Sequence, residues 1–145
     1  EIMVNKLLLP TDGSENALRA ARHAVALMKK NPDMELTVLY VRSPAENLVR
    51  FEPWTNQQDI DNEMVKMARN ALNRTKAVFE EAGLQVSDDL VEGDPGYAIA
   101  DYARKKGFGQ IIMGTRGLSN LSGIIMGSVG HQVLHFADVP VLFVK

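Results

Sequence analysis

Two patterns of hydrophobic residues alternate along the chain. Short runs rich in Leu, Ile and Val predict β-strands. The longer segments between them carry apolar residues three and four positions apart, which predicts amphipathic helices. The predicted strands cover residues 6–10, 35–41, 84–92, 110–113 and 139–144, and the predicted helices cover Glu15–Lys30, 58–82, Pro95–Lys106 and Ser128–Phe136.

The regular alternation of strands and helices predicts one α/β domain over residues 1–145. Strands joined by helices run parallel, with right-handed crossovers and helices on both faces of the sheet, which is the doubly wound, Rossmann-like arrangement. The strand 84–92 alternates polar and apolar residues, so we expect it at an edge of the sheet, with Asp88 and Asp89 facing solvent. The segment 43–57 is predicted to be a long loop.

The composition narrows the classes of function. The chain has a net charge of −2 and no long basic run, which argues against nucleic-acid binding, because a phosphate backbone requires a concentrated basic face. The sequence contains no Cys, which excludes a disulfide framework and a zinc–cysteine site and fits a cytoplasmic protein. No apolar run approaches the roughly 18 residues needed to cross a bilayer, so we expect no membrane association.

A glycine-rich segment near the end of the chain gives the clearest sign of a ligand. Gly114 and Gly117 follow the strand 110–113, and after nine further residues Gly127 and Ser128 open a helix. Glycines let backbone N–H groups approach phosphate oxygens, and a helix N-terminus adds unpaired N–H groups and the positive end of its dipole. The pattern predicts a phosphate site, although glycines after a strand also serve simply as turns.

The first two predicted strands also end in candidate ligand-binding residues. Thr11, Asp12 and Gly13 follow the first strand and Val41 ends the second, and ligands of open α/β sheets bind at the carboxyl ends of strands. The Asp12 carboxylate suits a ribose or a phosphate-bound Mg²⁺. Its alternative role, shared with Ser14, is to cap the following helix.

Motifs of the standard nucleotide enzymes are missing from the sequence. No Gly-Lys-Ser/Thr completes a Walker A motif, and Gly107 and Gly109 lack the third glycine of a dinucleotide fingerprint. His131 and His135 have a spacing that can hold a metal ion, but no third ligand is evident, so a histidine pair without metal is favoured.

The glycine pattern, Gly-x-x-Gly followed by nine residues and Gly-Ser, resembles the ATP-binding signature of the universal stress protein family. The segments 7–14, 92–95 and 140–144 resemble the family in the same order, so the resemblance covers essentially the whole chain. It implies a five-stranded sheet in the order 3-2-1-4-5, with ATP lying across the ends of strands 1 and 4. Because the signature is intact, the resemblance places the chain among the family's ATP binders.

The resemblance also implies the residues of the site. Pro10, Thr11, Asp12 and Val41 would border adenine and ribose, with Val41 contacting the base through its main chain. The ribose and phosphates would lie against the glycine-rich segment, at Met113, Gly114, Arg116, Gly117, Gly127, Ser128 and Val129. Arg116 is alternatively a solvent-exposed loop cation. The implied ligands are ATP and Mg²⁺, with Asp12 as the metal-binding residue.

The last predicted strand raises the question of assembly. The segment 139–144, from Val139 to Val144, is apolar and is expected at the outer edge of the sheet, where a bare edge invites association. The resemblance implies a homodimer in which an antiparallel partner strand covers this edge. The alternative is a short strand that is shielded by its own chain.

Three functions fit these residues. The favoured one is a stress-response regulator, in which ATP orders the segment from Thr115 to Met126 and an unknown partner protein recognises the ordered surface. The second is a slow ATPase or phosphoryl-transfer enzyme, for which Asp12 is the only plausible base. The third is an interaction protein whose pocket is vestigial.

Overall fold

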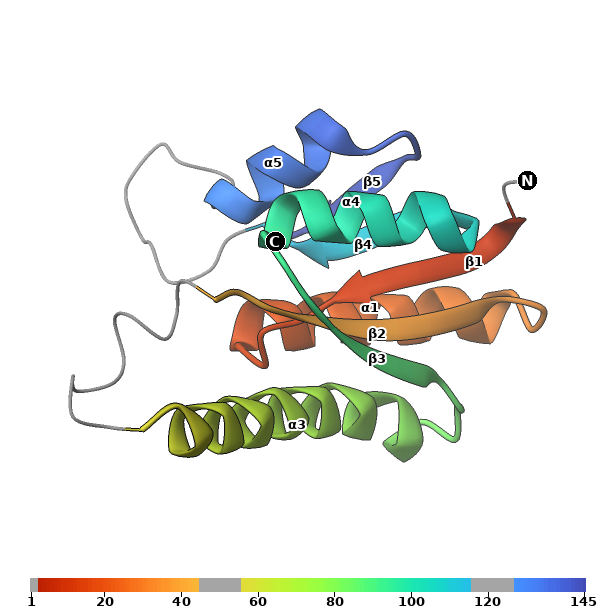
Figure 1. Cartoon of the computed structure of the whole chain (residues 1–145). Coiled ribbons are helices and arrows are strands. Elements are labelled where there is room, and N and C mark those ends of the chain that lie inside the picture. Colours follow the sequence, from red (N-terminus) through yellow and green to blue (C-terminus); the bar gives the residue numbers. More distant parts are fainter. Residues whose placement is uncertain (1–2, 45–55, 116–126) are drawn as a thin grey trace.

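The computed structural model describes residues 3–44, 56–115 and 127–145 of the chain. Its centre is a five-stranded parallel sheet in the order β3-β2-β1-β4-β5 (Figure 1), which confirms the expected fold class and strand order. The strands are β1 (Met3–Pro10), β2 (Glu35–Arg42), β3 (Ser87–Glu92), β4 (Phe108–Gly114) and β5 (Val141–Val144).

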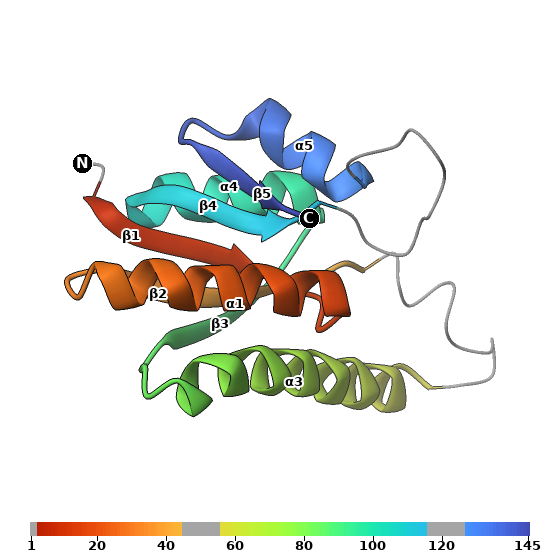
Figure 2. The same cartoon turned by 180° about the vertical axis from the view of Figure 1, so that it is seen from behind.

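In the described part of the chain, helices cover both faces of this sheet (Figures 1 and 2). On one face, α1 (Glu15–Lys30) and α3 (Gln57–Glu81) pack against Leu7, Leu9 and neighbouring side chains. On the other face, α4 (Pro95–Lys106) and α5 (Ser128–Phe136) pack against Leu8 and its neighbours. Successive side chains of β1 point to opposite faces, and Leu7, Leu8 and Leu9 are all fully buried because both faces are covered. This burial explains the continuous apolar run in the sequence.

The strand bounds differ from the prediction where backbone pairing decides them. β1 and β4 are longer than predicted, because Met3 pairs with Phe108. β3 is shorter, because its pairing with β2 begins only at Ser87. Leu84, which follows α3, instead donates its amide hydrogen to the Phe79 carbonyl at 2.9 Å. β5 begins only after Pro140, which has no N–H to donate to a ladder.

The helix bounds agree more closely with the prediction. Those of α1, α4 and α5 are confirmed, and each end of α3 lies one residue before its predicted position. Ser14 caps α1 by accepting a hydrogen bond from the Ala17 amide, and Gly83 follows α3 with a φ of +77°, the left-handed conformation that favours glycine after a helix. Among the described residues, no helix has the length and apolar character needed to cross a membrane.

Candidate functional site

A cavity of about 400 Å³ opens at the carboxyl ends of the strands. It lies where the strand order reverses, because the chain leaves β1 toward β2 on one side of the sheet and later places β4 on the other. This switch point is where open α/β sheets bind ligands. The lining residues that the sequence analysis named are Pro10, Thr11, Asp12, Val41, Met113, Gly114, Gly127, Ser128 and Val129.

Three helix N-termini meet at this cavity. Ser14, Asn16 and Ala17 line it from α1, Pro95 from α4, and the segment 127–130 from α5. A helix N-terminus carries unpaired N–H groups and a partial positive charge. The described lining residues therefore form an anion-binding arrangement without including a Lys or Arg.

The N-terminus of α5 has no side-chain cap. Gly127 occupies the N-cap position without making a side-chain cap, and its own amide donates to the Thr115 carbonyl at 3.0 Å. The first intrahelical bond runs from the His131 amide to the Gly127 carbonyl at 3.1 Å. The intervening amides of residues 128–130 are the unpaired donors of the first turn, and all three residues line the cavity.

Polar side chains of the β1–α1 loop form hydrogen bonds to the backbone of the same loop. The Asp12 Oδ1 accepts from the Ser14 amide at 2.9 Å, and the Thr11 Oγ1 accepts from the Gly13 amide at 3.0 Å. The Thr11 amide donates to the Leu39 carbonyl of β2 at 2.9 Å. Asp12 is exposed at the mouth of the cavity, whereas the Thr11 side chain is buried.

Apolar side chains form another part of the cavity wall. Pro10, Val41 and Met113 line the cavity as predicted, and Leu39 and Ile99 join them. Val41 lies within β2, one residue before its end, because the strand continues to Arg42, one residue beyond the predicted end. Such a wall suits a flat aromatic group, and the polar end of the cavity lies beside it.

Gly114 has a packing role that is independent of any ligand. A Cβ atom at this position would lie 2.7 Å from the backbone oxygen of Asn16, at the start of α1. In the sequence, this glycine was expected to allow the close approach of a phosphate. The close approach that the structure contains is that of helix α1 to the end of β4.

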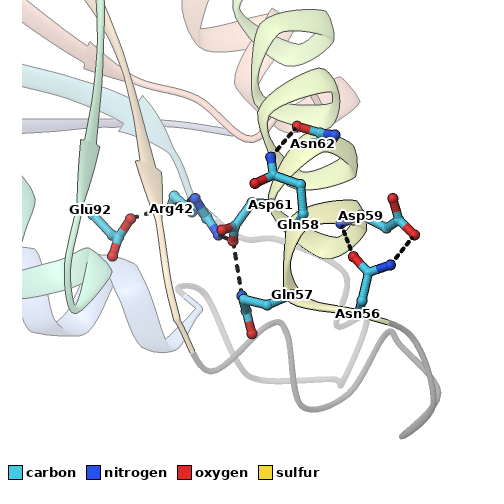
Figure 3. A network of polar contacts seen from close by, with 8 residues as sticks. All are labelled: Arg42, Asn56, Gln57, Gln58, Asp59, Asp61, Asn62 and Glu92. Atoms are coloured by element: carbon cyan, nitrogen blue, oxygen red, sulfur yellow. Dashed lines mark hydrogen bonds and ion pairs between the residues drawn. The ribbon is translucent and has the colours of Figure 1, made fainter.

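An ion-pair network is centred on Arg42, the residue that follows Val41 of the cavity wall (Figure 3). Arg42, the last residue of β2, pairs with Asp61 of α3 at 2.5 Å and with Glu92 of β3 at 3.6 Å. The hydrogen bonds that Arg42 and then Gln57 donate lower the pKa of the Asp61 carboxyl. The network fastens the start of α3 to the ends of β2 and β3.

Several expectations fall outside the described residues. Arg116 and Gly117 lie there, as do most of the segment from Thr115 to Met126 and much of the predicted 43–57 loop. His131 and His135 are exposed, and within the described ranges no three His, Asp or Glu side chains gather into a possible metal site.

The cavity is also lined by residues that were not predicted to belong to the site. They are Ser14, Asn16, Ala17, Leu39, Tyr40, Pro95, Ile99, Thr115 and Gly130. Position was the usable signal for Ser14, Asn16, Ala17, Pro95 and Gly130, which lie at helix N-termini near the carboxyl ends of strands, where doubly wound sheets bind ligands.

Comparison with known proteins agrees with this architecture. Residues 3–145 match the universal stress protein family. The universal stress protein MJ0531 of Methanocaldococcus jannaschii is 36% identical over 148 residues, which span 100% of this chain and 84% of that protein.

Solved structures extend the comparison to three dimensions. The solved structure of the hypothetical protein MJ0577, from the same archaeon, matches this chain with a TM-score of 0.82 at 35% identity. The match covers 99% of this chain and 97% of that chain. A universal stress protein from Archaeoglobus fulgidus, solved in complex with dAMP, shares the fold with a TM-score of 0.70 at 20% identity over 100% of both chains. With a sequence match over nearly its whole length and the corresponding fold, the chain belongs to the universal stress protein family.

Proposed function

We propose that this chain binds ATP in the cavity at the carboxyl ends of its strands and acts as a stress-response regulator through nucleotide occupancy. The observation that carries the proposal is the juxtaposition of an apolar wall at Pro10, Val41 and Met113 with the uncapped N-terminus of α5. A nucleotide has the matching chemistry, because it joins a flat base to a chain of phosphates. The dAMP complex of the Archaeoglobus fulgidus relative supports an adenine nucleotide as the ligand class.

In this proposal the base lies against the apolar wall and the phosphates lie against α5. The amides of Ser128 and Val129 and the hydroxyl of Ser128 bind phosphate oxygens, and Gly127 leaves space for them. Thr11 and Asp12 border the ribose. Arg116 and Gly117 belong to the proposed phosphate site on the strength of the sequence signature alone.

Mg²⁺ fits the site as a companion of the phosphates. Asp12 is the only carboxylate among the described lining residues, and one of its oxygens accepts from the Ser14 amide. Mg²⁺ commonly takes one or two carboxylates, substrate phosphates and water, so Asp12 suffices only when a nucleotide supplies further oxygens. The ion would neutralise phosphate charge.

We propose binding over catalysis as the main activity. Phosphoryl transfer requires positioned metal and charge stabilisation around the transferred group, whereas the described lining residues offer a single acid and no base partner for it. The second candidate is a slow ATPase with Asp12 as the base. Single-turnover hydrolysis that approaches ordinary enzyme rates and is lost in Asp12→Ala would favour it.

The deciding experiment is nucleotide analysis of the purified protein. The protein is denatured, the released nucleotide is identified by chromatography, and the affinities for ATP, AMP and cAMP are measured by calorimetry with and without Mg²⁺. We expect ATP to bind and Mg²⁺ to strengthen its binding. Absence of both released nucleotide and measurable ATP binding would favour a vestigial pocket.

The variant Gly127→Val tests the phosphate end of the cavity. Gly127 has a φ of −77° and a ψ of 175°, a conformation that any residue can adopt, so valine adds bulk without backbone strain. We expect the fold to persist and ATP affinity to fall by at least about tenfold, equivalent to about 1.4 kcal/mol. Gly83→Val, at a left-handed glycine after α3, is the control; it should lower stability and leave affinity unchanged. Wild-type affinity in Gly127→Val would mean that this glycine serves only as a turn.

A further inference from the structure

A directed chain of hydrogen bonds links the cavity to a helix that does not line it. Within the described residues, α3 contributes nothing to the cavity wall. Thr75 in the middle of α3 is nevertheless fully buried, and its Oγ1 lies 2.7 Å from the Oγ1 of Thr11, a residue 64 positions earlier that does line the cavity.

The direction of each hydrogen bond follows from the number of hydrogens available. A threonine hydroxyl has a single hydrogen to donate, and that of Thr75 goes to the Ala71 carbonyl at 2.9 Å. Thr11 must therefore donate to Thr75, while its own oxygen accepts from the Gly13 amide at 3.0 Å. Each hydroxyl donates once and accepts once, so both buried groups are satisfied in only one arrangement.

Backbone contact reinforces this link. A Cβ atom on Gly13 would lie 3.0 Å from the Cβ and 3.1 Å from the Cα of Ala71, and Gly13 has a φ of +78°. The loop backbone therefore lies directly on the turn of α3 from Ala71 to Thr75. A shift of that turn would move the Gly13 amide and, with it, the adjoining Thr11 and Asp12.

We infer that Thr75 is a positioning residue for the nucleotide site, acting through Thr11 to hold the β1–α1 loop against the ligand. The inference rests on the proposed nucleotide binding. It also makes α3 the helix coupled to occupancy, since coupling between two sites is reciprocal: a ligand that fixes Thr11 and Asp12 also fixes the Thr75 turn.

The test compares Thr75→Val with two matched variants. Valine keeps the shape of threonine but removes the hydroxyl, which leaves the buried Thr11 hydroxyl without its acceptor. Thr75→Ser retains the hydroxyl. Val78→Ala, on the same helix, removes packing against the core cluster but none of these hydrogen bonds. Should Thr75→Val fail to fold, Thr75→Ala removes the same hydroxyl with less crowding.

Two measurements are made on each variant: ATP affinity by calorimetry, and hydrogen exchange of the Gly13 amide by NMR without nucleotide. We expect Thr75→Val to lose affinity by about tenfold, the scale of one unsatisfied buried hydroxyl, and to exchange faster at Gly13. Thr75→Ser should remain close to the wild type in both measurements. Val78→Ala should lower the melting temperature and change neither.

The outcomes separate this inference from the proposed function. A wild type that binds no nucleotide contradicts the proposed function, and exchange at Gly13 then decides whether Thr75 positions the loop. A wild type that binds ATP, together with a Thr75→Val variant of equal affinity, overturns the inference and leaves the proposed function intact.

Discussion

Single residues at the cavity are constrained by backbone contacts as well as by ligand chemistry. Gly114 illustrates this, because the atom that excludes a side chain there is the carbonyl oxygen of Asn16. Thr11 is similar: its hydroxyl is engaged by Gly13 and Thr75, inside the protein. A residue can therefore belong to the sequence signature of a binding site and still be selected by packing.

Replacing Gly114 with alanine tests this packing role. We expect Gly114→Ala to lower the free energy of unfolding by about 1–3 kcal/mol, the range for inserting a methyl group into a packed region. Urea-induced unfolding measures the loss. Adding Asn16→Ala should give no rescue, because the clash involves the backbone of Asn16. Unchanged stability in Gly114→Ala would show that α1 can withdraw from β4 at little cost.

At the scale of elements, the contact between α4 and α5 orients two helix N-termini toward the cavity. Gly96 in the first turn of α4 is buried, and a Cβ atom there would overlap the Cβ of Gln132 on α5. Further along the same contact, the rings of Tyr97 and Phe136 meet edge to face at 5.4 Å. The two helices can therefore pack this closely only because position 96 has no side chain.

Paired substitutions at Gly96 and Gln132 test this contact. We expect Gly96→Ala to lower the free energy of unfolding by about 1–3 kcal/mol through overpacking. Gln132→Gly should cost about 1 kcal/mol through helix propensity. The double variant should be more stable than the sum of the two losses, because it restores the space between the helices. Additive losses in a double-mutant cycle would mean that the helices separate freely.

At the scale of the whole molecule, the open edge of β5 is the feature we propose to form a homodimer. Among the described strands β5 pairs with β4 alone, and its side chains pack half-buried against both core clusters. The backbone edge that faces away from β4 is therefore the part of β5 with which a partner strand would pair. An antiparallel partner strand along a two-fold axis would cover it.

The variant Val141→Pro tests the proposed dimer. Val141 pairs with Ile111, whose amide bonds to the Pro140 carbonyl, so in a parallel ladder the Val141 amide points away from β4. We expect the wild type to sediment with twice the mass of one chain and Val141→Pro with the mass of one. Val139→Pro, before the ladder, should remain dimeric. A monomeric wild type at micromolar concentration would contradict the proposal.

The sequence alone determined the order and type of the elements. Apolar runs and helical spacing are local signals, and the rules for parallel crossovers convert their alternation into a doubly wound sheet with its crevice at Thr11, Asp12 and the glycine-rich segment. The expected strand order came from resemblance to the family and is confirmed.

The tertiary structure decided which distant residues meet. Asp88 and Asp89 were expected to face solvent, but Arg69 pairs with Asp88 at 2.8 Å and the Tyr102 hydroxyl donates to Asp89 at 2.7 Å. The local sequence does not predict such pairs, because they depend on the register of the strands and on the angle at which the helices pack on them. For the same reason, the hydrogen bond between Thr11 and Thr75, 64 positions apart, could not be predicted from the sequence, because it depends on how α3 packs on the sheet.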